Sequence, residues 1–209
     1  MAADKETLRG VLRACRKALS AAYVASASCA VQERLLHCSY FDSAATLVLY
    51  AAKDNEIETG LVLAEALATR RCVLFPRVVP TSGELLLVRV DSPAELAPGA
   101  FGLMEPTGAE VVPAASLGPS LICVPGLAFT PGGQRLGRGG GYYDRLLAGA
   151  GPQSQSVGLA YSFQVLDQIP QSLGDHRLNL ILTESTSYGD DTIAEPPSLW
   201  TDQGGVPKC

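Results

Sequence analysis

Residues 120–147 read SLICVPGLAFTPGGQRLGRGGGYYDRLL, in which an apolar run, a glycine-rich loop and a second apolar stretch follow one another directly. The run at 120–124 has the length and composition of a strand that is covered on both faces. A helix is expected to begin near Tyr142, where apolar residues resume. A buried strand that passes through a loop into a helix is typical of an α/β fold with a parallel core.

The loop between this strand and this helix has the chemistry of an anion site. Its glycines are Gly133, Gly137, Gly139, Gly140 and Gly141. Glycine lets backbone N–H groups turn inward as an anion nest, and a helix start adds partial positive charge. Arg135 and Arg138 can bind phosphate oxygens through two N–H groups at once. Asp144, in the first helical turn, either stabilises the helix dipole or holds Mg²⁺. The sequence therefore predicts a polyphosphate site, with a flexible loop that binds nothing as the alternative.

Two familiar phosphate loops do not account for this segment. Gly132 and Gly137 have the spacing of a P-loop, but Arg138 and Gly139 stand where that motif requires lysine and serine or threonine. The dinucleotide fingerprint fails as well, because the glycine that it requires at position 142 is a tyrosine.

The rest of the chain continues the alternation of helices and strands. Strands are expected at 46–50, 72–75, 84–90, 120–124, 156–160 and 178–182, and helices at 4–19, 22–37 and 57–70. We therefore predict a single-domain α/β fold, with a mostly parallel central sheet flanked by helices, over residues 1–187. The proline- and glycine-rich stretch 98–119 reads as a long loop, and residues 188–209 as a loosely ordered C-terminal tail.

Composition excludes several functional classes. The chain has 209 residues, of which 47% are hydrophobic and 18% charged, and this is the balance of a globular protein. No apolar run approaches the roughly 20 residues that span a bilayer, so we expect no membrane insertion. The formal net charge of −5 argues against a nucleic-acid partner. With only His37 and His176, and no G-x-S-x-G or C-x-x-C motif, neither a Ser-His-Asp triad nor a zinc site is expected.

The first expected helix carries a row of cations. Lys5, Arg9 and Arg13 recur every four residues on one side of it. Such a row on a helix is usually a solvated face. A basic amphipathic start also suggests a mitochondrial presequence, but Asp4 and Glu6 interrupt it. We therefore expect a cytoplasmic protein, with a mitochondrial fraction as the alternative.

Residues 135–144, RLGRGGGYYD, resemble the signature R-L-G-R-G-K-G-Y-Y-D of the 5-formyltetrahydrofolate cyclo-ligase family, also called methenyltetrahydrofolate synthetases. Further segments match that family in order over residues 4–184. They are Lys5-x3-Arg9, EIET at 56–59, FGLMEP at 101–106, VPGLAF at 124–129, Tyr161-x2-Gln164, Ile169-Pro170 and the stretch 175–183.

The resemblance implies an α/β fold and a reaction that uses Mg-ATP. In that reaction 5-formyltetrahydrofolate, with or without a polyglutamate tail, becomes 5,10-methenyltetrahydrofolate, and ADP and phosphate are released. Phosphoryl transfer of this kind depends on positioning and charge neutralisation more than on a protein nucleophile, which fits a chain poor in histidine.

The resemblance also assigns roles to residues by position. Lys5 and Arg138 are implied as catalytic. ATP binding is implied for Lys5, Arg9, Arg135, Leu136, Gly137, Arg138, Gly139, Gly140, Gly141, Tyr142 and Tyr143. Folate binding is implied for Ala51, Glu56, Arg138, Gly139, Gly140, Gly141 and Tyr142, and Mg²⁺ binding for Asp144 and Asn179. Core packing is the alternative for both tyrosines, and a solvated position at a helix start is the alternative for Glu56.

Two positions depart from the family pattern. Gly140 replaces the signature lysine, and Asn179 stands where the family commonly has an aspartate. The two changes cancel in formal charge, which suggests that they compensate each other. The resemblance therefore predicts an active cyclo-ligase, and the departures support the alternative of a weakened or inactive paralogue that binds folate or nucleotide. The net charge of −5, with no obvious apolar patch, predicts a monomer.

Overall fold

The computed structural model describes residues 4–189. The α-helices are α1 (Lys5–Lys17), α2 (Ala21–Leu36), α3 (Ser39–Ser43), α4 (Gly60–Ala68) and α5 (Tyr142–Ala148). The strands are β1 (Thr46–Val48), β2 (Cys72–Val79), β3 (Glu84–Arg89), β4 (Leu96–Pro98), β5 (Met104–Pro106), β6 (Val111–Val112), β7 (Ser120–Val124), β8 (Ala128–Phe129), β9 (Arg135–Leu136), β10 (Ser154–Leu159), β11 (Leu180–Leu182) and β12 (Ser187–Gly189). Short 3₁₀ turns occupy Pro93–Glu95, Ala100–Gly102, Ala114–Ser116 and Ser162–Gln164.

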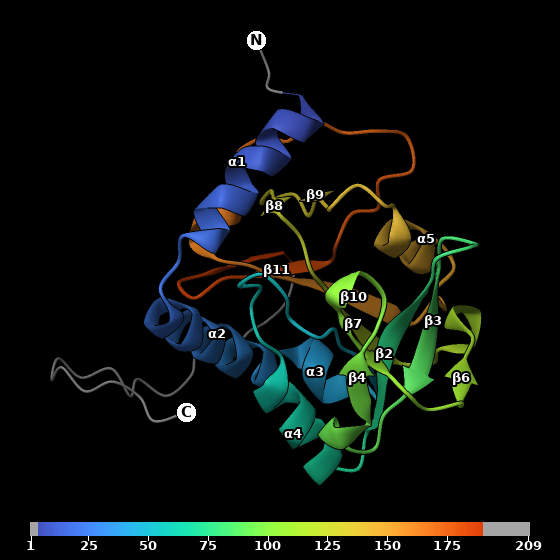
Figure 1. Ribbon diagram of the computed structural model, residues 1–209. Coiled ribbons are helices and arrows are strands. Elements are labelled where there is room, and N and C mark those ends of the chain that lie inside the picture. The colour runs from blue at the N-terminus through green and yellow to red at the C-terminus, as the bar shows by residue number, and fades with distance from the viewer. Residues whose placement is uncertain (1–3, 190–209) are drawn as a thin grey trace, which may run out of the picture.

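An eight-stranded sheet forms the centre of the molecule, in the order β12-β11-β10-β7-β1-β2-β3-β6 (Figure 1). Five neighbouring strands of this sheet run parallel to one another, namely β11, β10, β7, β1 and β2. The remaining strands, β12 on one side and β3 with β6 on the other, pair antiparallel. The prediction of an α/β fold with a mostly parallel central sheet is therefore confirmed.

Helices cover both faces of this sheet. Successive residues of each central strand point to opposite faces, so each strand contributes side chains to the core on both sides. Leu47 and Leu121 belong to the hydrophobic cluster that packs beneath α2, α3 and α4. Their neighbours Val48 and Ile122 belong to a second cluster, which includes Leu146 of α5. The sequence shows these strands as unbroken apolar runs because both of their faces are buried.

α1 stands apart from these two layers and crosses the end of the sheet (Figure 1). Its apolar side, represented by Leu12, packs on Leu127, Leu136 and Ile169 in a third cluster. Asp4 caps the helix by accepting a hydrogen bond from the backbone N–H of Thr7, at 2.8 Å. α1 is thus attached to the loops that follow the sheet strands, and not to the sheet itself.

Helices α1 and α2 match their predicted ranges within two residues at each end. α4 is shorter than expected, because residues 57–59 are engaged by Tyr50. The Tyr50 hydroxyl donates to the carbonyl of Ile57 at 2.8 Å, and the Thr59 hydroxyl donates to the carbonyl of Tyr50 at 2.7 Å. These bonds keep residues 57–59 out of the helix, and α4 begins at Gly60.

Two further segments differ from their sequence-based descriptions. The stretch 98–119 is not a plain loop, since it contains β5 and β6 and pairs β4 with β5. Tyr188 and Gly189, which the sequence assigns to the C-terminal tail, belong to β12, and residues 190–209 of that tail lie outside the described part of the chain. Within residues 4–189, each helix is too short or too polar to cross a bilayer.

Candidate functional site

A cavity lined by residues of several segments lies where the order of the parallel strands reverses. From β1 the chain proceeds to β2 on one side, and later to β7, β10 and β11 on the other. The segments that leave the carboxyl ends of β1 and β7 therefore diverge, and this opens a crevice at that edge of the sheet. A cavity of about 490 Å³ occupies this crevice, a volume within the range of small-molecule sites.

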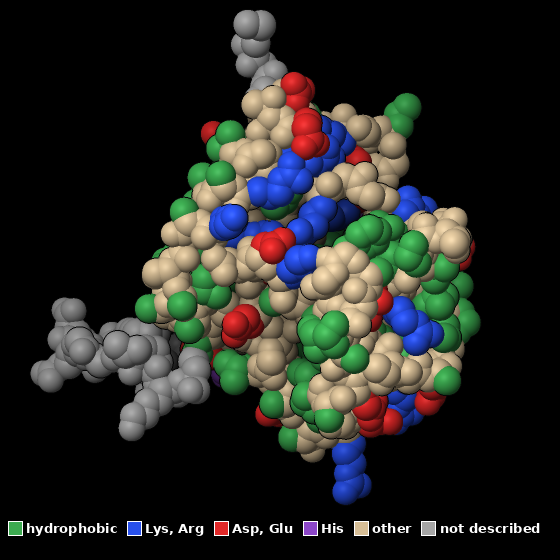
Figure 2. Space-filling view, viewed as in Figure 1, with side chains coloured by type: hydrophobic (Ala, Val, Ile, Leu, Met, Phe, Trp, Pro, Cys, Tyr) green, Lys and Arg blue, Asp and Glu red, His purple; other side chains and the backbone are tan. Residues whose placement is uncertain are grey.

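The cavity gathers nearly all of the site residues that the sequence analysis named. The predicted residues that line it are Lys5, Arg9, Ala51, Glu56, Arg135, Leu136, Gly137, Arg138, Gly139, Gly140, Gly141, Tyr142, Tyr143 and Asp144. They come from α1, from the segment after β1, and from the glycine loop with the start of α5. These three segments are distant in sequence. Figure 2 shows Lys and Arg side chains grouped on the same face, near α1.

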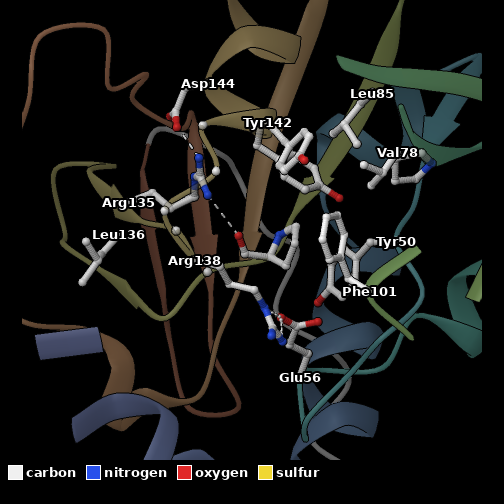
Figure 3. Close-up of a pocket in the computed structure, with 18 of the residues that line it drawn as sticks. Tyr50, Glu56, Val78, Leu85, Phe101, Arg135, Leu136, Arg138, Tyr142 and Asp144 are labelled. Atoms are coloured by element: carbon white, nitrogen blue, oxygen red, sulfur yellow. Dashed lines mark hydrogen bonds and ion pairs between the residues drawn. The ribbon is translucent and has the colours of Figure 1, made fainter. Parts of the chain in front are cut away.

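The two sides of the cavity differ in chemistry, as Figure 3 shows. Arg135 and Arg138 occupy one side, where they point to Asp144 and Glu56. The other side is apolar and aromatic, and its lining residues are Tyr50, Pro76, Val78, Leu85, Phe101, Leu103, Met104 and Tyr142. Such a cavity can hold a flat, partly apolar ring system beside an anionic group.

Most of the apolar lining was missed by the sequence analysis. Val78 and Leu85 face each other across the β2–β3 pair, and apolar strand residues carry no motif that separates a cavity wall from a core. Phe101 is 65% exposed at the cavity rim. Its φ of +54°, in the left-handed region, is uncommon for a bulky residue, and local strain of this kind concentrates at ligand sites.

Within the glycine loop, left-handed backbone angles occur where side chains would be disfavoured. Gly139 has φ of +110° and Gly141 has φ of +65°, conformations that glycine adopts without steric cost. Gly141 then caps α5. Arg9 of α1 donates to the carbonyl of Gly137 at 3.0 Å, which ties the helix to the loop.

Arg138 and Glu56 are joined by a network of charges. The Arg138 Nη2 lies 2.9 Å and its Nε 3.2 Å from Glu56 Oε1, and the Arg138 Nη1 lies 2.8 Å from Asp54 Oδ2. Glu56 is 7% exposed and Arg16, on its other side, is 1% exposed. The Arg16 Nη2 lies 3.4 Å from the same Glu56 oxygen. Glu56 is therefore a buried carboxylate between two arginines and not a solvated helix-start residue.

A second set of charges surrounds Asp144. Its Oδ1 accepts from the Arg135 Nη2 at 2.9 Å and from the backbone N–H of His176 at 3.4 Å. His176 follows Asp175, whose Oδ2 lies 2.8 Å from the Lys5 Nζ. Two carboxylates, Asp144 and Asp175, therefore stand close together in the cavity lining. A pair of carboxylates with substrate phosphates is the usual setting for Mg²⁺, and no cluster of three or more potential metal ligands occurs in residues 4–189.

Asn179 is the one predicted site residue that does not line the cavity. It lies just before β11, and its Oδ1 accepts from the backbone N–H and the hydroxyl of Ser156, both at 2.9 Å. Its position argues against the expected metal role, because its side chain is hydrogen-bonded to β10 and does not line the cavity. Asp175, four residues earlier, was not predicted as a site residue, although it is the first residue of a segment that resembles the family. Gly140 lies in the cavity wall, so the two departures from the family pattern do not share a site.

The tyrosines of the loop divide between packing and cavity. Tyr143 packs partly against the second hydrophobic cluster and also lines the cavity. Burial, with the nearby Glu56 carboxylate adding to it, raises the pKa of Tyr143 far above its usual value. The phenol is thus kept neutral as a hydrogen-bond donor. The ring of Tyr142 lies beneath the Arg145 guanidinium, at 5.3 Å, and would be 2.6 Å from a Cβ at Gly140.

Comparison with known proteins identifies the relatives of this fold and cavity. The sequence model of the 5-formyltetrahydrofolate cyclo-ligase family matches residues 1–184. A protein of Caenorhabditis elegans named probable 5-formyltetrahydrofolate cyclo-ligase is 31% identical over 174 residues, which are 78% of this chain and 84% of the relative. A mitochondrial 5-formyltetrahydrofolate cyclo-ligase of Arabidopsis thaliana is 27% identical over 206 residues, covering 87% of this chain and 74% of the relative. The solved structure of Aquifex aeolicus 5,10-methenyltetrahydrofolate synthetase is similar with a TM-score of 0.74 and 32% identity, over 96% of this chain and 98% of the other.

Proposed function

Because this chain belongs to the 5-formyltetrahydrofolate cyclo-ligase family, we propose that it converts 5-formyltetrahydrofolate into 5,10-methenyltetrahydrofolate with consumption of Mg-ATP. ADP and phosphate are the other products. The observation that carries the proposal is the cavity itself, in which the residues of the family signature, the α1 cations and Glu56 meet.

The cationic side of the cavity suits a polyphosphate. Arg9, Arg135 and Arg138 line it together with the left-handed Gly139 and Gly141. The Arg135 Nε is buried without an acceptor among the described residues, and a buried unused donor next to a cavity is what an anionic oxygen would satisfy. Glycines at this turn let an anion approach the backbone closely. Lys5 adds a mobile cation at the end of α1.

We propose Asp144 and Asp175 as the residues that would hold Mg²⁺, with Asp175 in place of Asn179. Both are cavity-lining carboxylates, and the backbone contact between His176 and Asp144 brings them together. Mg-ATP, when bound, supplies the phosphoryl group that makes the formyl oxygen a good leaving group. Lys5 and Arg135, which now pair with these two carboxylates, would then face the phosphates.

The apolar side of the cavity suits the folate. A pterin ring can stack on Phe101 and Tyr142 and pack on Val78 and Leu85, while the buried Glu56 carboxylate can accept hydrogen bonds from ring N–H groups. No nucleophilic side chain is needed for this reaction. The residues would hold the formyl oxygen and the attacking nitrogen in place, and the arginines would neutralise developing negative charge.

The test is the appearance of the methenyl chromophore from 5-formyltetrahydrofolate, with and without Mg-ATP. Arg9→Ala and Arg13→Ala form a matched pair, because both arginines lie on α1 and only Arg9 lines the cavity. Wild type and Arg13→Ala should turn over, while Arg9→Ala and Arg138→Ala should lose most of their rate. Turnover without ATP, or equal rates for the two α1 variants, would contradict the proposal.

The alternative, a relative that binds folate or nucleotide but turns over poorly, rests on Gly140. This position lines the cavity without the cation of the family signature. If wild type is silent while Gly140→Lys with Asn179→Asp is active, that alternative replaces the first proposal. The ring of Tyr142 must move to admit the lysine, which a flexible side chain can do.

We also propose that the protein is a cytoplasmic monomer that accepts polyglutamylated folate. Light scattering, cell fractionation and turnover of the triglutamate substrate test these three points separately.

A further inference from the structure

Arg138 is bound by two carboxylates at once. Its Nε and Nη2 reach Glu56, and its Nη1 reaches Asp54 at 2.8 Å. A guanidinium presents five N–H donors in a fixed planar fork, and these contacts occupy the groups with which it would grasp a phosphate. Since Arg138 lies in the anion-binding loop, its contact with Asp54 competes with any anion that enters.

Asp54 is held in place by an unusual turn. Asp54 and Asn55 both have left-handed backbone angles, with φ of +53° and +56°. The buried Arg16 fixes this turn, because its Nε donates to the Asp54 carbonyl at 2.8 Å. The Asn55 amide returns a hydrogen bond to the Arg16 carbonyl at 3.0 Å. α1 therefore positions the Asp54 carboxylate, which does not itself line the cavity.

The two carboxylates that bind Arg138 would be left in different environments if the arginine moved away. Glu56 keeps the Arg16 guanidinium at 3.4 Å and the Lys53 backbone N–H at 3.1 Å, so its buried charge stays compensated. The Asp54 side chain is 53% exposed and returns to water. Arg138 can thus move away without leaving an unpaired buried charge, which is the usual obstacle to breaking such a cluster.

We propose that Asp54 is a positioning residue that acts through Arg138: it holds the guanidinium against Glu56 until a polyphosphate binds, and then releases it. This inference rests on the proposed function, because it takes the entering anion to be the triphosphate of ATP. The Arg138 contact lowers the pKa of Asp54 below its usual value, so the pair is fully charged at neutral pH. The free energy needed to break the Arg138–Asp54 ion pair then weakens the binding of every polyphosphate.

The expected size of the effect follows from the exposure of the pair. An ion pair of this exposure contributes little, so removing it should tighten Mg-ATP binding by about two- to fivefold. Asp54→Asn is the variant to use, because asparagine adopts the left-handed conformation as readily as aspartate and keeps the turn. Asp91→Asn is the matched control. Asp91 also pairs with an arginine, Arg89, at 3.0 Å, and its side chain is 67% exposed, but Arg89 does not line the cavity whereas Arg138 does.

The experiment measures the dissociation constant of Mg-ATP by calorimetry for wild type, Asp54→Asn and Asp91→Asn, and again for Asp54→Asn in an Arg138→Ala background. We expect Asp54→Asn to bind more tightly than both wild type and the control. The gain should vanish when Arg138 is absent, since the two substitutions act through one contact.

Each other outcome overturns the inference. Equal affinities for Asp54→Asn and Asp91→Asn, with wild type binding Mg-ATP, would refute the role of Asp54 and leave the proposed function standing. A gain that persists without Arg138 would mean that Asp54 only repels the anion through space. If no variant binds Mg-ATP, the inference and the ATP dependence of the proposed function fail together.

Discussion

Replacing Arg16 by methionine should destabilise the fold although Arg16 does not line the cavity. The side chain is 1% exposed and its guanidinium donates to the carbonyls of Asp54, at 2.8 Å, and Gly126, at 3.2 Å. Its Nη2 faces Glu56. Methionine fills part of the volume but leaves both carbonyls without this donor and removes one of the two charges that compensate the buried Glu56.

The magnitude can be bounded from these contacts. Removing one partner of a buried ion pair costs about 3–5 kcal/mol, much of it from the charge left uncompensated. Glu56 would keep Arg138 and the Lys53 N–H, so the lower limit applies and we expect a loss of about 3 kcal/mol. For a domain of this size that corresponds to a fall of about 6–12 °C in the unfolding midpoint.

Urea unfolding followed by far-UV circular dichroism measures this loss, with Arg13→Met as the control. Arg13 lies one turn away on α1 and its side chain is 44% exposed, pairing with Glu6, whose side chain is 72% exposed. The control should lose about 0.5 kcal/mol or less, as exposed pairs do. If both variants lost the same amount, or if Arg16→Met lost less than about 1 kcal/mol, the buried arginine would not have the structural weight assigned to it.

Three further outcomes are expected. Burial and a hydrogen bond to Glu184 raise the pKa of Tyr23 to about 12, above the usual value of about 10. Between these two pH values the folded state keeps a proton that the unfolded chain loses, so the urea midpoint should fall as the pH rises from 10 to 12. The fall should be smaller in Tyr23→Phe. Asp144→Asn should weaken Mn²⁺ binding, followed by electron paramagnetic resonance with ATP present, by about tenfold or more, and unchanged binding would remove Asp144 from the metal site. Gly133→Ala should cost at least about 2 kcal/mol in urea unfolding, because the position has φ of +78° and a Cβ there would lie 2.2 Å from the carbonyl oxygen of Leu178; a stable variant would show that this loop can shift.

The central strands were predictable because the pattern that identifies them is local. Residues 121–124 are all apolar, and both faces of β7 are buried. The neighbours of β11 were harder to assign, since Leu178 is apolar yet uses its backbone N–H to bond Gly133 of the glycine loop. Its hydrophobicity indicates burial, which is correct, but not strand pairing. The antiparallel direction of β3 likewise depends on a short turn and not on the composition of the strand.

The site was predictable where chemistry and spacing coincide, and not where distance in sequence separates the partners. The glycine loop could be identified as an anion site because Arg135 and Arg138 lie among its glycines. The apolar wall did not, because Val78 and Leu85 read as ordinary strand residues. The buried position of Arg16 could not be inferred either, since it follows the exposed Arg13 and precedes Lys17 on the same helix. Only the fold shows that one of these cations faces a buried carboxylate.

The attachment of α1 has a consequence for the order in which the protein assembles. The helix is anchored by contacts with Gly126, Gly137 and Asp175, at sequence separations of 110, 128 and 170 residues. During synthesis at about 5–20 residues per second, the last of these partners emerges on the order of ten seconds after the helix itself. Contacts so far apart form slowly, because loop closure must precede them. The basic helix therefore lacks these three partners while the sheet forms, and the cavity is completed late, when this early segment docks.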